Sequence, residues 1–303
     1  MATTGSGSSV IIEGRTLGLS NLDKNLYPDS PGGFTKSQII DYYVRIAPVM
    51  LPHLAGRACT MVRFPDGVNN KSFFAKNLPT HAPEWFDRIQ RKDVSYGVIN
   101  ELAALVWAAN MAAIELHVPM HRDGDGPHGH PPANAIPDRV VFDLDPGPDT
   151  DITQCSQVAQ LISELIVPLG FSLAAKTSGS KGLQLYATPP APMEYGGDGG
   201  TTGFAKRVAE GLERANPALV VSRMTKELRT GKVLIDWSQN VPAKTTVAVY
   251  ALRARVEPTV STPVTWDEIN AAADGAPLRF TAEQVLERVS VHGDLFGPPW
   301  SPS

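Results

Sequence analysis

The stretch Arg139-Val140-Val141-Phe142-Asp143-Leu144-Asp145-Pro146-Gly147 has the pattern of a strand that ends in two carboxylates. Its β-branched and aromatic residues favour a buried strand, and Pro146-Gly147 ends it. Because residues two apart in a strand point to the same face, Asp143 and Asp145 project side by side, with Cα atoms roughly 6.5–7 Å apart. Carboxylates this close repel each other unless protons or cations lie between them. The pair predicts either a site for hard divalent cations such as Mg²⁺ or Mn²⁺, or an ordinary turn or capping pair.

A second strand of the same form lies far along the chain. Lys232-Val233-Leu234-Ile235-Asp236-Trp237 is an apolar run that ends in one carboxylate. Three aspartates at the ends of two apolar strands fit a two-metal site for phosphoryl transfer. The second strand therefore favours the metal-site interpretation over the turn.

Length and composition indicate an ordinary globular protein. A chain of 303 residues suits one large domain or two intimate ones, and it can bury a sizeable core. No apolar run approaches the ~18 residues that a membrane span needs. Residues Met1 to Ser9 are small and uncharged, which predicts a loose tail and not a signal peptide. Cys59 and Cys155 lack metal-binding spacing, so we expect buried free thiols of a cytosolic protein.

The charges are distributed unevenly. The net charge of −4 argues against nucleic-acid binding. However, residues 57–92 hold seven Lys or Arg against three Asp or Glu, and residues 221–255 hold seven against two. From residue 256 onward the balance reverses, with seven Asp or Glu and two Arg. This distribution fits a single polyanion-binding face, and a solvated surface explains it equally well.

Two lysines near the N-terminus are candidates for phosphate binding. Thr35 is a suitable cap for a helix from Lys36 to about Met50. Lys36 then lies at the helix N-terminus, where backbone N–H groups and the helix dipole favour anions. Lys24 precedes it across a loop. The spacing is compatible with a paired-lysine phosphate pocket but does not by itself establish one.

Two adjacent aromatic residues are candidates for base stacking. Phe73 and Phe74 are flanked by Lys71 and Lys76, a combination that can stack on bases while the lysines meet phosphates. Since adjacent residues of a strand face opposite sides, we expect at least one of these rings to lie in the core.

A second candidate for phosphate binding is the loop Ser178-Gly179-Ser180-Lys181-Gly182, which lies between two apolar strands. Its backbone N–H groups, hydroxyls and lysine could form the nest that a triphosphate needs. It is not a Walker loop, because the spacing differs and a strand follows it. An ordinary hairpin is the alternative.

The histidines carry weaker signals. His117 alternates with apolar neighbours, as a satisfied core histidine does. Residues 121–138 are rich in Gly, Pro and His, which predicts a mobile surface loop. His128 and His130 could bind a metal adventitiously there, and we expect nothing catalytic in this loop.

Hydrophobic periodicity predicts the remaining elements. We expect helices over residues 101–113, 149–169 (capped by Thr150 or Asp149), 202–215, 266–273 and 281–290. We expect strands over residues 10–20, 58–64, 114–119, 171–175 and 245–255, the last of which carries Arg253 and Arg255 on one face.

Taken in order, these motifs resemble the polymerase domain of bacterial DNA ligase D, in the archaeo-eukaryotic primase superfamily. The motifs are DKNLYP (23–28), KSxxxDYY (36–43), FF (73–74), ELHVP (115–119), VFDLDPG (141–147), TSGSKGL (177–183) and KVLIDWSQN (232–240). The resemblance extends from Lys24 to about Arg255 and continues in a similar C-terminal tail.

The resemblance implies an α+β fold. The expected architecture is a primase-polymerase catalytic core with two small mixed or antiparallel sheets flanked by helices, in the manner of an RRM-like palm. We expect a disordered tail over residues 1–9 and one domain over 10–303. Its parts are an N-terminal subdomain (10–120), a catalytic subdomain (121–255) and a C-terminal helical tail (256–303).

The resemblance also implies roles for individual residues. Asp143 and Asp145 hold two divalent ions, Mn²⁺ or Mg²⁺, and Asp236 completes the ion nearer the primer terminus. Lys24 and Lys36 grip a DNA 5′-phosphate. Residues around the incoming nucleotide are His117, Ser178, Ser180, Lys181, Gln184, Gln239 and Arg253. Residues that face template or duplex DNA are Phe73, Phe74, Arg63, Lys76 and Arg229.

Two departures from the family pattern bear on function. Gln184 stands where the family usually has histidine, and glutamine still donates an N–H but carries no titratable charge. The difference concerns triphosphate binding and not the metal site. The chain also has no Lys-x-Asp-Gly ligase motif, so we expect a stand-alone primase-polymerase or an excised domain that relies on a separate ligase.

The implied function is filling of short gaps in DNA by two-metal nucleotidyl transfer, with recognition of the 5′-phosphate and a preference for ribonucleotides. Implied partners are gapped or broken duplex DNA, NTPs or dNTPs, a separate ATP-dependent DNA ligase and the Ku end-binding protein. End joining and base excision repair are both compatible pathways, in a bacterial cytoplasm and at the nucleoid. The alternatives are a non-catalytic module that binds DNA gaps or ends, and a metal-dependent nuclease, against which the TSGSK loop argues.

Overall fold

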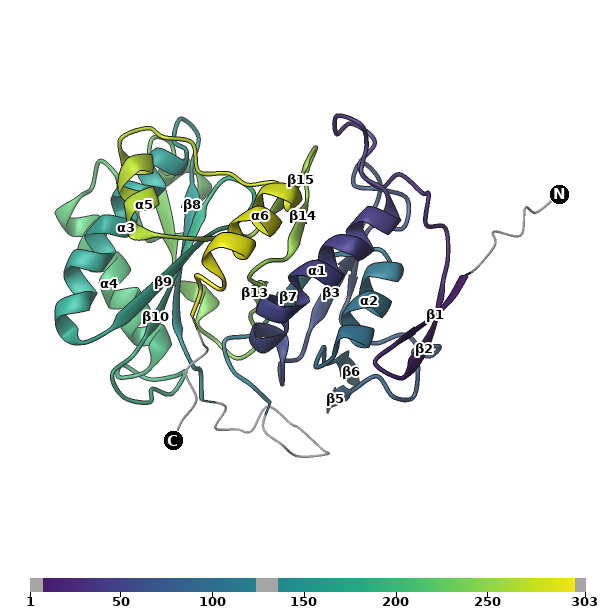
Figure 1. The fold of residues 1–303 in the computed structure, drawn as a ribbon. Coiled ribbons are helices and arrows are strands. Elements are labelled where there is room, and N and C mark those ends of the chain that lie inside the picture. Colours follow the sequence, from purple (N-terminus) through teal and green to yellow (C-terminus); the bar gives the residue numbers. More distant parts are fainter. Residues whose placement is uncertain (1–7, 124–135, 298–303) are drawn as a thin grey trace.

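Two sheets organise the residues that the structure, a computed structural model, describes, which are 8–123 and 136–297 (Figure 1). The first sheet is antiparallel, in the order β13-β7-β3-β4. Helices α1 and α2 pack against each other beside this sheet. The elements of this lobe are α1 (Lys36–Leu54), β3 (Thr60–Arg63), β4 (Phe73–Ala75), α2 (Leu102–Asn110), β7 (Ala113–Val118) and β13 (Thr246–Val247).

The second sheet has six strands in the order β11-β12-β8-β10-β9-β16 and is antiparallel except for the β11–β12 pair. Helices α3, α4 and α5 lie together on the far side of this sheet from the first lobe (Figure 1). Its elements are β8 (Val140–Pro146), α3 (Ile152–Ile166), β9 (Ser172–Thr177), β10 (Leu183–Thr188), α4 (Thr201–Ala215), β11 (Val220–Val221), β12 (Val233–Asp236), β16 (Pro263–Val264) and α5 (Trp266–Ala273).

The two faces of strand β8 belong to different cores. Val140, Phe142 and Leu144 are fully buried in the hydrophobic cluster that includes the helices of the second lobe. Val141, which points the other way, packs in the cluster of the first lobe. Asp143 and Asp145 share the Val141 face, so the strand carries both carboxylates to the side of the sheet that faces the first lobe.

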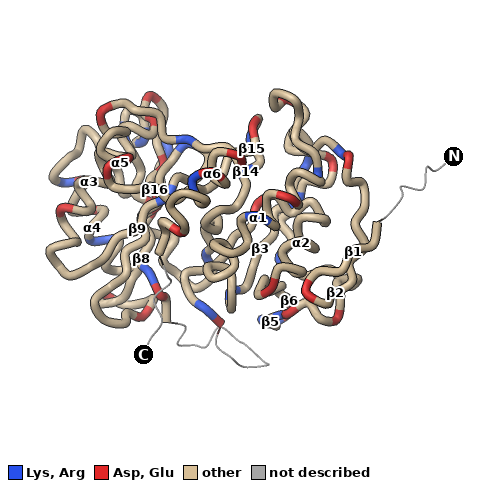
Figure 2. The backbone as a smooth tube through the Cα atoms, in the orientation of Figure 1, with Lys and Arg blue, Asp and Glu red and all other residues tan. Residues whose placement is uncertain are grey.

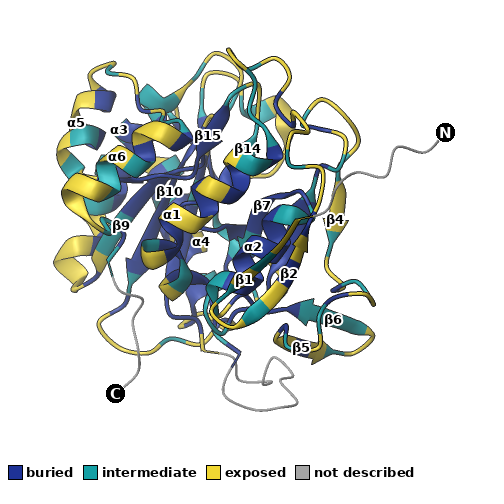
Figure 3. Ribbon diagram, turned by 45° about the vertical axis from the view of Figure 1, so that its right-hand side comes forward, coloured by how far each residue is buried: buried dark blue, intermediate teal, exposed yellow. Residues whose placement is uncertain are grey.

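Smaller elements complete the described chain. Figure 3 shows the strands of both sheets largely buried, with β4 exposed at an edge. Helix α6 returns to pack on α1 and β15. The remaining elements are the hairpins β1 (Ser8–Ile12) with β2 (Arg15–Leu19), β5 (Arg88–Arg91) with β6 (Val94–Gly97) and β14 (Leu252–Ala254) with β15 (Pro258–Val260), the helix α6 (Ala282–His292) and three 3-10 turns, η1 (Val167–Leu169), η2 (Lys226–Leu228) and η3 (Trp237–Gln239).

The predicted α+β class with two sheets is confirmed, and several boundaries differ. Thr35 caps α1 with a capping box, as predicted. Helix α3 is capped by Asp151, and not by Asp149 or Thr150, because Asp149 adopts φ 65°, outside the helical range. The segment 10–20 is a hairpin with a turn at Glu13-Gly14, and its first strand begins at Ser8, inside the predicted tail.

The predicted strand over residues 245–255 is wrong. It consists of β13 and β14, which belong to different sheets. Tyr250, with φ 65°, breaks the strand between them, and its buried side chain packs in the first core. Burial of a large aromatic side chain therefore overrides the alternating pattern here.

Two predictions from composition agree with the structure. Within the described residues, no helix combines the length and the apolar character that crossing a bilayer requires. Cys59 and Cys155 are both buried free thiols.

Candidate functional site

Four polar residues form a row across the six-stranded sheet. Gln184 on β10 pairs with Lys176 on β9 and with Asp143 on β8, and Asp143 in turn pairs with Asp236 on β12. Cross-strand partners share a face, so all four side chains lie on the face toward the first lobe. The pairing of β8 with β12 brings together the three aspartates that the sequence placed at strand ends.

Burial and neighbouring carboxylates disfavour the charged form of two of the aspartates. Burial, and after it the Asp145 carboxylate, raises the pKa of Asp143 to about 7. Burial and the Asp236 carboxylate also raise the pKa of Asp145. Asp143 Oδ1 accepts a hydrogen bond of 3.0 Å from Gln184 Nε2. The raised pKa values mean that a proton or a cation stabilises this face of the sheet.

Asp236 is fixed by the turn that follows its strand. Its Oδ1 accepts hydrogen bonds from the backbone N–H and the hydroxyl of Ser238, at 2.9 and 2.6 Å. Its Oδ2 accepts one from Gln239 Nε2 at 2.9 Å. The 3-10 turn η3 therefore supplies the donors for Asp236, and Gln239, which the sequence predicts near the incoming nucleotide, lies beside this carboxylate.

Two residues of the row, Asp143 and Gln184, line a cleft of about 470 Å³ between the two sheets. Most of the predicted nucleotide-binding residues line this cleft, together with Asp143 and Asp145. Its walls also carry Arg255 and Thr246, which the sequence did not single out as site residues. The predicted residues in the lining are His117, Asp143, Asp145, Ser178, Ser180, Lys181, Gln184, Arg229, Gln239 and Arg253.

The loop after β9 is shaped by its own serine and glycine. Ser178 Oγ accepts hydrogen bonds from the backbone N–H groups of Ser180 and Gly182, at 3.2 and 3.1 Å. The predicted nest is therefore partly filled by the loop itself. Gly179 has φ 67°, and a Cβ there would lie 2.6 Å from Arg253 Cγ. Only glycine lets the loop pack against Arg253.

A carboxylate that the sequence reasoning missed organises the opposite wall. Glu115 accepts hydrogen bonds of 3.0 Å from His117 Nε2, 3.0 Å from Arg253 Nε and 3.1 Å from the Ala254 backbone N–H. Burial alone would raise the pKa of Glu115, but the hydrogen bond from His117 and the Arg253 charge outweigh it and lower the pKa to about 2. Glu115 and His117 are two apart in a strand, which is the signal that could have revealed this pair. His117 is thus a cleft residue and not a core histidine.

The donor set fits divalent cations in chemical type. Asp143, Asp145 and Asp236 supply the carboxylate oxygens that Mg²⁺ and Mn²⁺ prefer, and the repulsion among them favours a bound cation. Among the described residues, however, no three His, Cys, Asp or Glu side chains already stand close enough to form a complete metal site. The Gln184 and Gln239 contacts hold two of these carboxylates in place.

A second and larger hollow, of about 910 Å³, adjoins the cleft, because Gln239 and Thr245 line both. Phe74 and Lys76, for which the family resemblance implies DNA contacts, lie on its wall. Figure 2 shows Lys and Arg along both lobes. The further charged and aromatic residues of this groove are Arg91, Lys92, Asp93, Tyr96 and Lys244.

The expectation that one of the two phenylalanines lies in the core is wrong. Phe73 is 49% exposed and Phe74 is 70% exposed. Their strand, β4, is a three-residue edge strand of the first sheet, and of its residues Ala75 alone packs against the core. Lys71 Nζ lies 5.9 Å from the Phe73 ring centroid.

The two predicted phosphate-binding lysines lie together. The Lys36 backbone N–H donates to Lys24 O over 2.9 Å. Lys36 Nζ donates to Ser20 O over 2.6 Å, and Lys24 Nζ pairs with Asp66 at 2.8 Å. Burial, and after it the charges of Lys24 and Arg63, lowers the pKa of Lys36 to about 8. Arg63 therefore lies near Lys24 and Lys36, and it lines neither the cleft nor the groove.

Several residues at the described ends of the predicted surface loop 121–138 are buried, among them His121, Asp123 and Asp138. His121 is buried, its Nδ1 lies 2.7 Å from Tyr195 Oη, and its Nε2 lies 2.9 Å from Arg91. Burial lowers the pKa of His121 to about 4. His128 and His130 lie outside the described residues.

Comparisons with known proteins agree on one family. Residues 35–296 match the family described as LigD, primase-polymerase domain. The chain is 46% identical over 284 residues to the multifunctional non-homologous end joining protein LigD of Mycolicibacterium smegmatis, covering 92% of this chain and 35% of that protein. It is 29% identical over 280 residues to the bifunctional non-homologous end joining protein LigD of Bacillus subtilis, covering 92% and 43%.

A solved structure is also similar. It is the polymerase domain from Mycobacterium tuberculosis Ligase D in complex with DNA, with a TM-score of 0.84 and 44% identity. The match covers 92% of this chain and 96% of that one. The chain spans about a third of the length of the Mycolicibacterium relative, 35%.

Proposed function

Because the chain belongs to the family of LigD primase-polymerase domains, and is thus a nucleotidyltransferase, we propose that it extends a primer by template-directed nucleotide transfer in the cleft between its sheets. The observation that carries this proposal is one cleft that is lined both by the Asp143–Asp145 pair and by basic residues, among them Lys181 and Arg253. A triphosphate and the hydroxyl that attacks it require these two kinds of group close together.

The cleft residues divide the work of binding and orientation. Lys181, Arg253 and Arg255 supply positive charge for the triphosphate. Glu115 holds His117 and Arg253 on the wall of the cleft by hydrogen bonds. No covalent intermediate is required, since positioning and charge are sufficient for phosphoryl transfer.

Asp143, Asp145 and Asp236 would hold two divalent ions, Mn²⁺ or Mg²⁺, which supply neutralisation of the triphosphate and a lowered pKa for the primer 3′-hydroxyl. The chain itself orients these carboxylates. Gln184 donates to Asp143, and Ser238 and Gln239 donate to Asp236.

The groove beside the cleft would receive the template strand. Phe74 presents an exposed ring for base stacking, and Lys76 and Lys244 supply charge for phosphates. The Lys24 and Lys36 pair would bind the 5′-phosphate on the far side of a short gap. Phe73, next to Phe74 on the exposed edge strand, would add a second stacking surface.

The relatives are named as non-homologous end joining proteins, and we place this chain in the same kind of repair, where gaps at broken ends need filling. A separate ATP-dependent ligase would seal the product, and the Ku protein would hold the ends. The same activity would also serve base excision repair. We also propose that the protein prefers ribonucleotides, is activated by Mn²⁺ and acts at the nucleoid in the bacterial cytoplasm.

The test uses a duplex with a short gap that carries a 5′-phosphate, incubated with Mn²⁺ and either rNTPs or dNTPs, and resolved on a denaturing gel. Stepwise extension of the primer, stronger with rNTPs, is the expected outcome. Binding of the duplex without extension would favour the non-catalytic module. A shortened primer that needs no triphosphate would favour the nuclease.

A further inference from the structure

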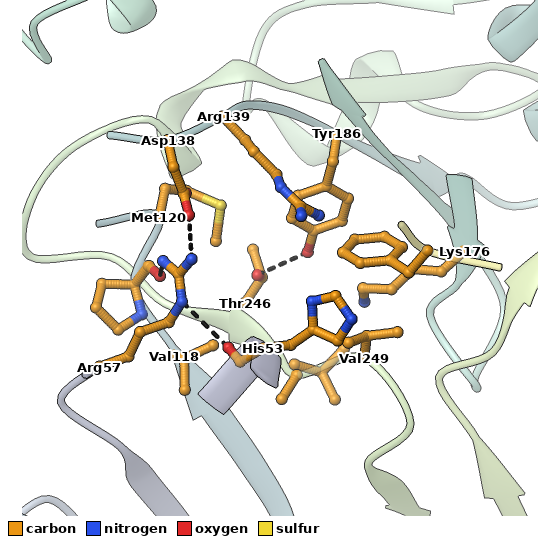
Figure 4. A pocket seen from close by; sticks show the side chains of 14 residues that line it. His53, Arg57, Val118, Met120, Asp138, Arg139, Lys176, Tyr186, Thr246 and Val249 are labelled. Carbon is orange, nitrogen blue, oxygen red and sulfur yellow. Dashed lines mark hydrogen bonds and ion pairs between the residues drawn. The ribbon is translucent and has the colours of Figure 1, made fainter. Parts of the chain in front are cut away.

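Lys176 is a buried lysine on β9 to which the proposed mechanism assigns no role. Its Nζ donates to Gln184 Oε1 and, over 2.7 Å, to Ser261 Oγ. Nζ lies 5.3 Å from the centroid of the Tyr186 ring. Figure 4 shows Lys176 and Tyr186 entering the same small cavity between the lobes.

The contacts of Lys176 decide which way the Gln184 amide points. Ser261 Oγ donates to Thr177 O over 2.9 Å, so it can only accept from Lys176. Lys176 therefore uses one N–H on Ser261 and another on Gln184. The ammonium has three N–H groups and no lone pair, so it can only donate to Gln184.

A second donor acts on the same amide oxygen. Tyr186 Oη lies 3.2 Å from Gln184 Oε1 and donates to it, since the amide oxygen has no hydrogen to give. Tyr186 Oη also lies 2.7 Å from Thr246 Oγ1 on β13 of the first sheet. Because the single hydroxyl hydrogen of Tyr186 is donated to Gln184, Tyr186 Oη accepts the hydrogen bond from Thr246.

With Oε1 fixed on the side of Lys176 and Tyr186, the amide nitrogen faces Asp143 Oδ1 at 3.0 Å. A flipped amide would set its oxygen against the Asp143 carboxylate and turn its N–H groups toward two donors. We propose that Lys176 is a positioning residue, which locks the Gln184 amide so that it donates to Asp143 and fixes that carboxylate on the cleft wall. This inference rests on the proposed function, in which Asp143 serves nucleotidyl transfer.

The test is a double-mutant cycle on gap filling. Lys176→Met keeps the length of the side chain and removes its N–H donors. The Tyr186 hydroxyl can then turn its hydrogen to Thr246 Oγ1 and accept from a flipped Gln184 amide, so the amide is no longer locked. We expect turnover at saturating nucleotide to fall by about tenfold or more, with KM for the nucleotide changed by less than about threefold. In a Gln184→Ala background, the same Lys176→Met change should alter turnover by less than about twofold, because its target is gone.

Two further variants separate positioning from simple packing. Ser261→Ala removes the other acceptor of Lys176 and leaves its bond to Gln184, so turnover should stay within about twofold even if thermal stability drops. Gln184→Glu keeps an oxygen for Lys176 but places a second oxygen against Asp143, so it should lose turnover as a flipped amide does. It also serves as the test variant if Lys176→Met fails to fold.

A readout without catalysis distinguishes failure of this inference from failure of the proposed function. The Mn²⁺ concentration that produces half of the thermal-shift response measures how well Asp143 is positioned. Lys176→Met should raise the Mn²⁺ concentration at half response when Gln184 is present. It should not do so in the Gln184→Ala background. Wild-type protein that never extends a primer would remove the proposed function but leave this comparison interpretable. Additive effects of the two changes, or wild-type turnover in Lys176→Met, would overturn the positioning role.

Discussion

Asp236 on β12 lies directly opposite Asp143 on β8 in the antiparallel register of the six-stranded sheet. Burial, the Asp145 carboxylate and, more weakly, the Asp236 carboxylate raise the pKa of Asp143 to about 7, against a hydrogen bond from Gln184 that lowers it. The sheet thus holds like charges together, at a cost in stability that a bound cation or proton relieves.

Replacing Asp143 by Asn should stabilise the protein while it abolishes primer extension. A raised pKa means that the folded state binds the proton more tightly than the unfolded state does, so stability is lost as the pH rises from the ordinary range of aspartate through about 7, and the loss is complete above that pH. This cost disappears as the pH falls toward the ordinary range of aspartate. Thermal unfolding should therefore show a gain of a few degrees for Asp143→Asn at pH 8, where ~1 kcal/mol shifts Tm by about 2–4 °C, and a smaller gain at pH 5.

The control for this prediction is Asp267→Asn, which removes an exposed carboxylate in the first turn of α5. It should leave extension unchanged. Equal gains for Asp143→Asn at pH 5 and pH 8 would contradict the electrostatic account.

Recognition of a 5′-phosphate should weaken as the pH rises from 7 to 9. Burial and the neighbouring charges of Lys24 and Arg63 lower the pKa of Lys36 to about 8, so above that pH Lys36 loses the charge that attracts the phosphate. Fluorescence anisotropy on gapped duplexes with and without the 5′-phosphate measures the preference. It should vanish in Lys24→Ala/Lys36→Ala. Lys206→Ala, an exposed site on α4, should retain it.

Phe74 should contribute more to template binding than Phe73, because only Phe74 lines the groove beside the cleft. Phe74→Ala should weaken binding to gapped DNA by about 1–3 kcal/mol, the usual value of one stacked base. The free energy of unfolding should change by less than about 0.5 kcal/mol, since the ring is exposed. Equal losses for Phe73→Ala and Phe74→Ala would argue against the groove as the template site.

Glu115→Gln should loosen the wall that binds the triphosphate. Its negative charge holds both His117 and Arg253, and these contacts bring the pKa of Glu115 to about 2. We expect KM for the nucleotide to rise by about tenfold with a smaller change in turnover. Steady-state kinetics with varied nucleotide tests this, and Glu210→Gln, a surface partner of Lys206, is the matched control.

The dependence of protein stability on pH in the acid range provides a second check on Glu115. Because its folded pKa is lowered, its ionised form stabilises the protein above the ordinary glutamate pKa, and this contribution is lost as the pH falls toward 2. Glu115→Gln should therefore lose stability relative to wild type at pH 7, and this difference should shrink in acid.

The sequence alone determined the site chemistry that depends on local spacing. The alternation in 139–147 placed Asp143 and Asp145 on one face, and the form of 232–237 singled out Asp236. Ordered motifs were sufficient to recognise the family, and that recognition is confirmed over residues 35–296. The capping box at Thr35 was also readable, because capping involves only neighbours in the chain.

Only the tertiary structure decided which distant residues meet. The register of β8 against β12 and β10 set Asp143 between Asp236 and Gln184, and a shift by one residue would have turned Asp143 away. Exposure of both Phe73 and Phe74 follows from the edge position of β4, which no local pattern shows. The roles of Glu115 and Lys176 likewise depend on partners more than 80 residues away, Arg253 and Ser261. Long-range strand pairing and burial are properties of the assembled sheet, so the short-range sequence pattern left them open.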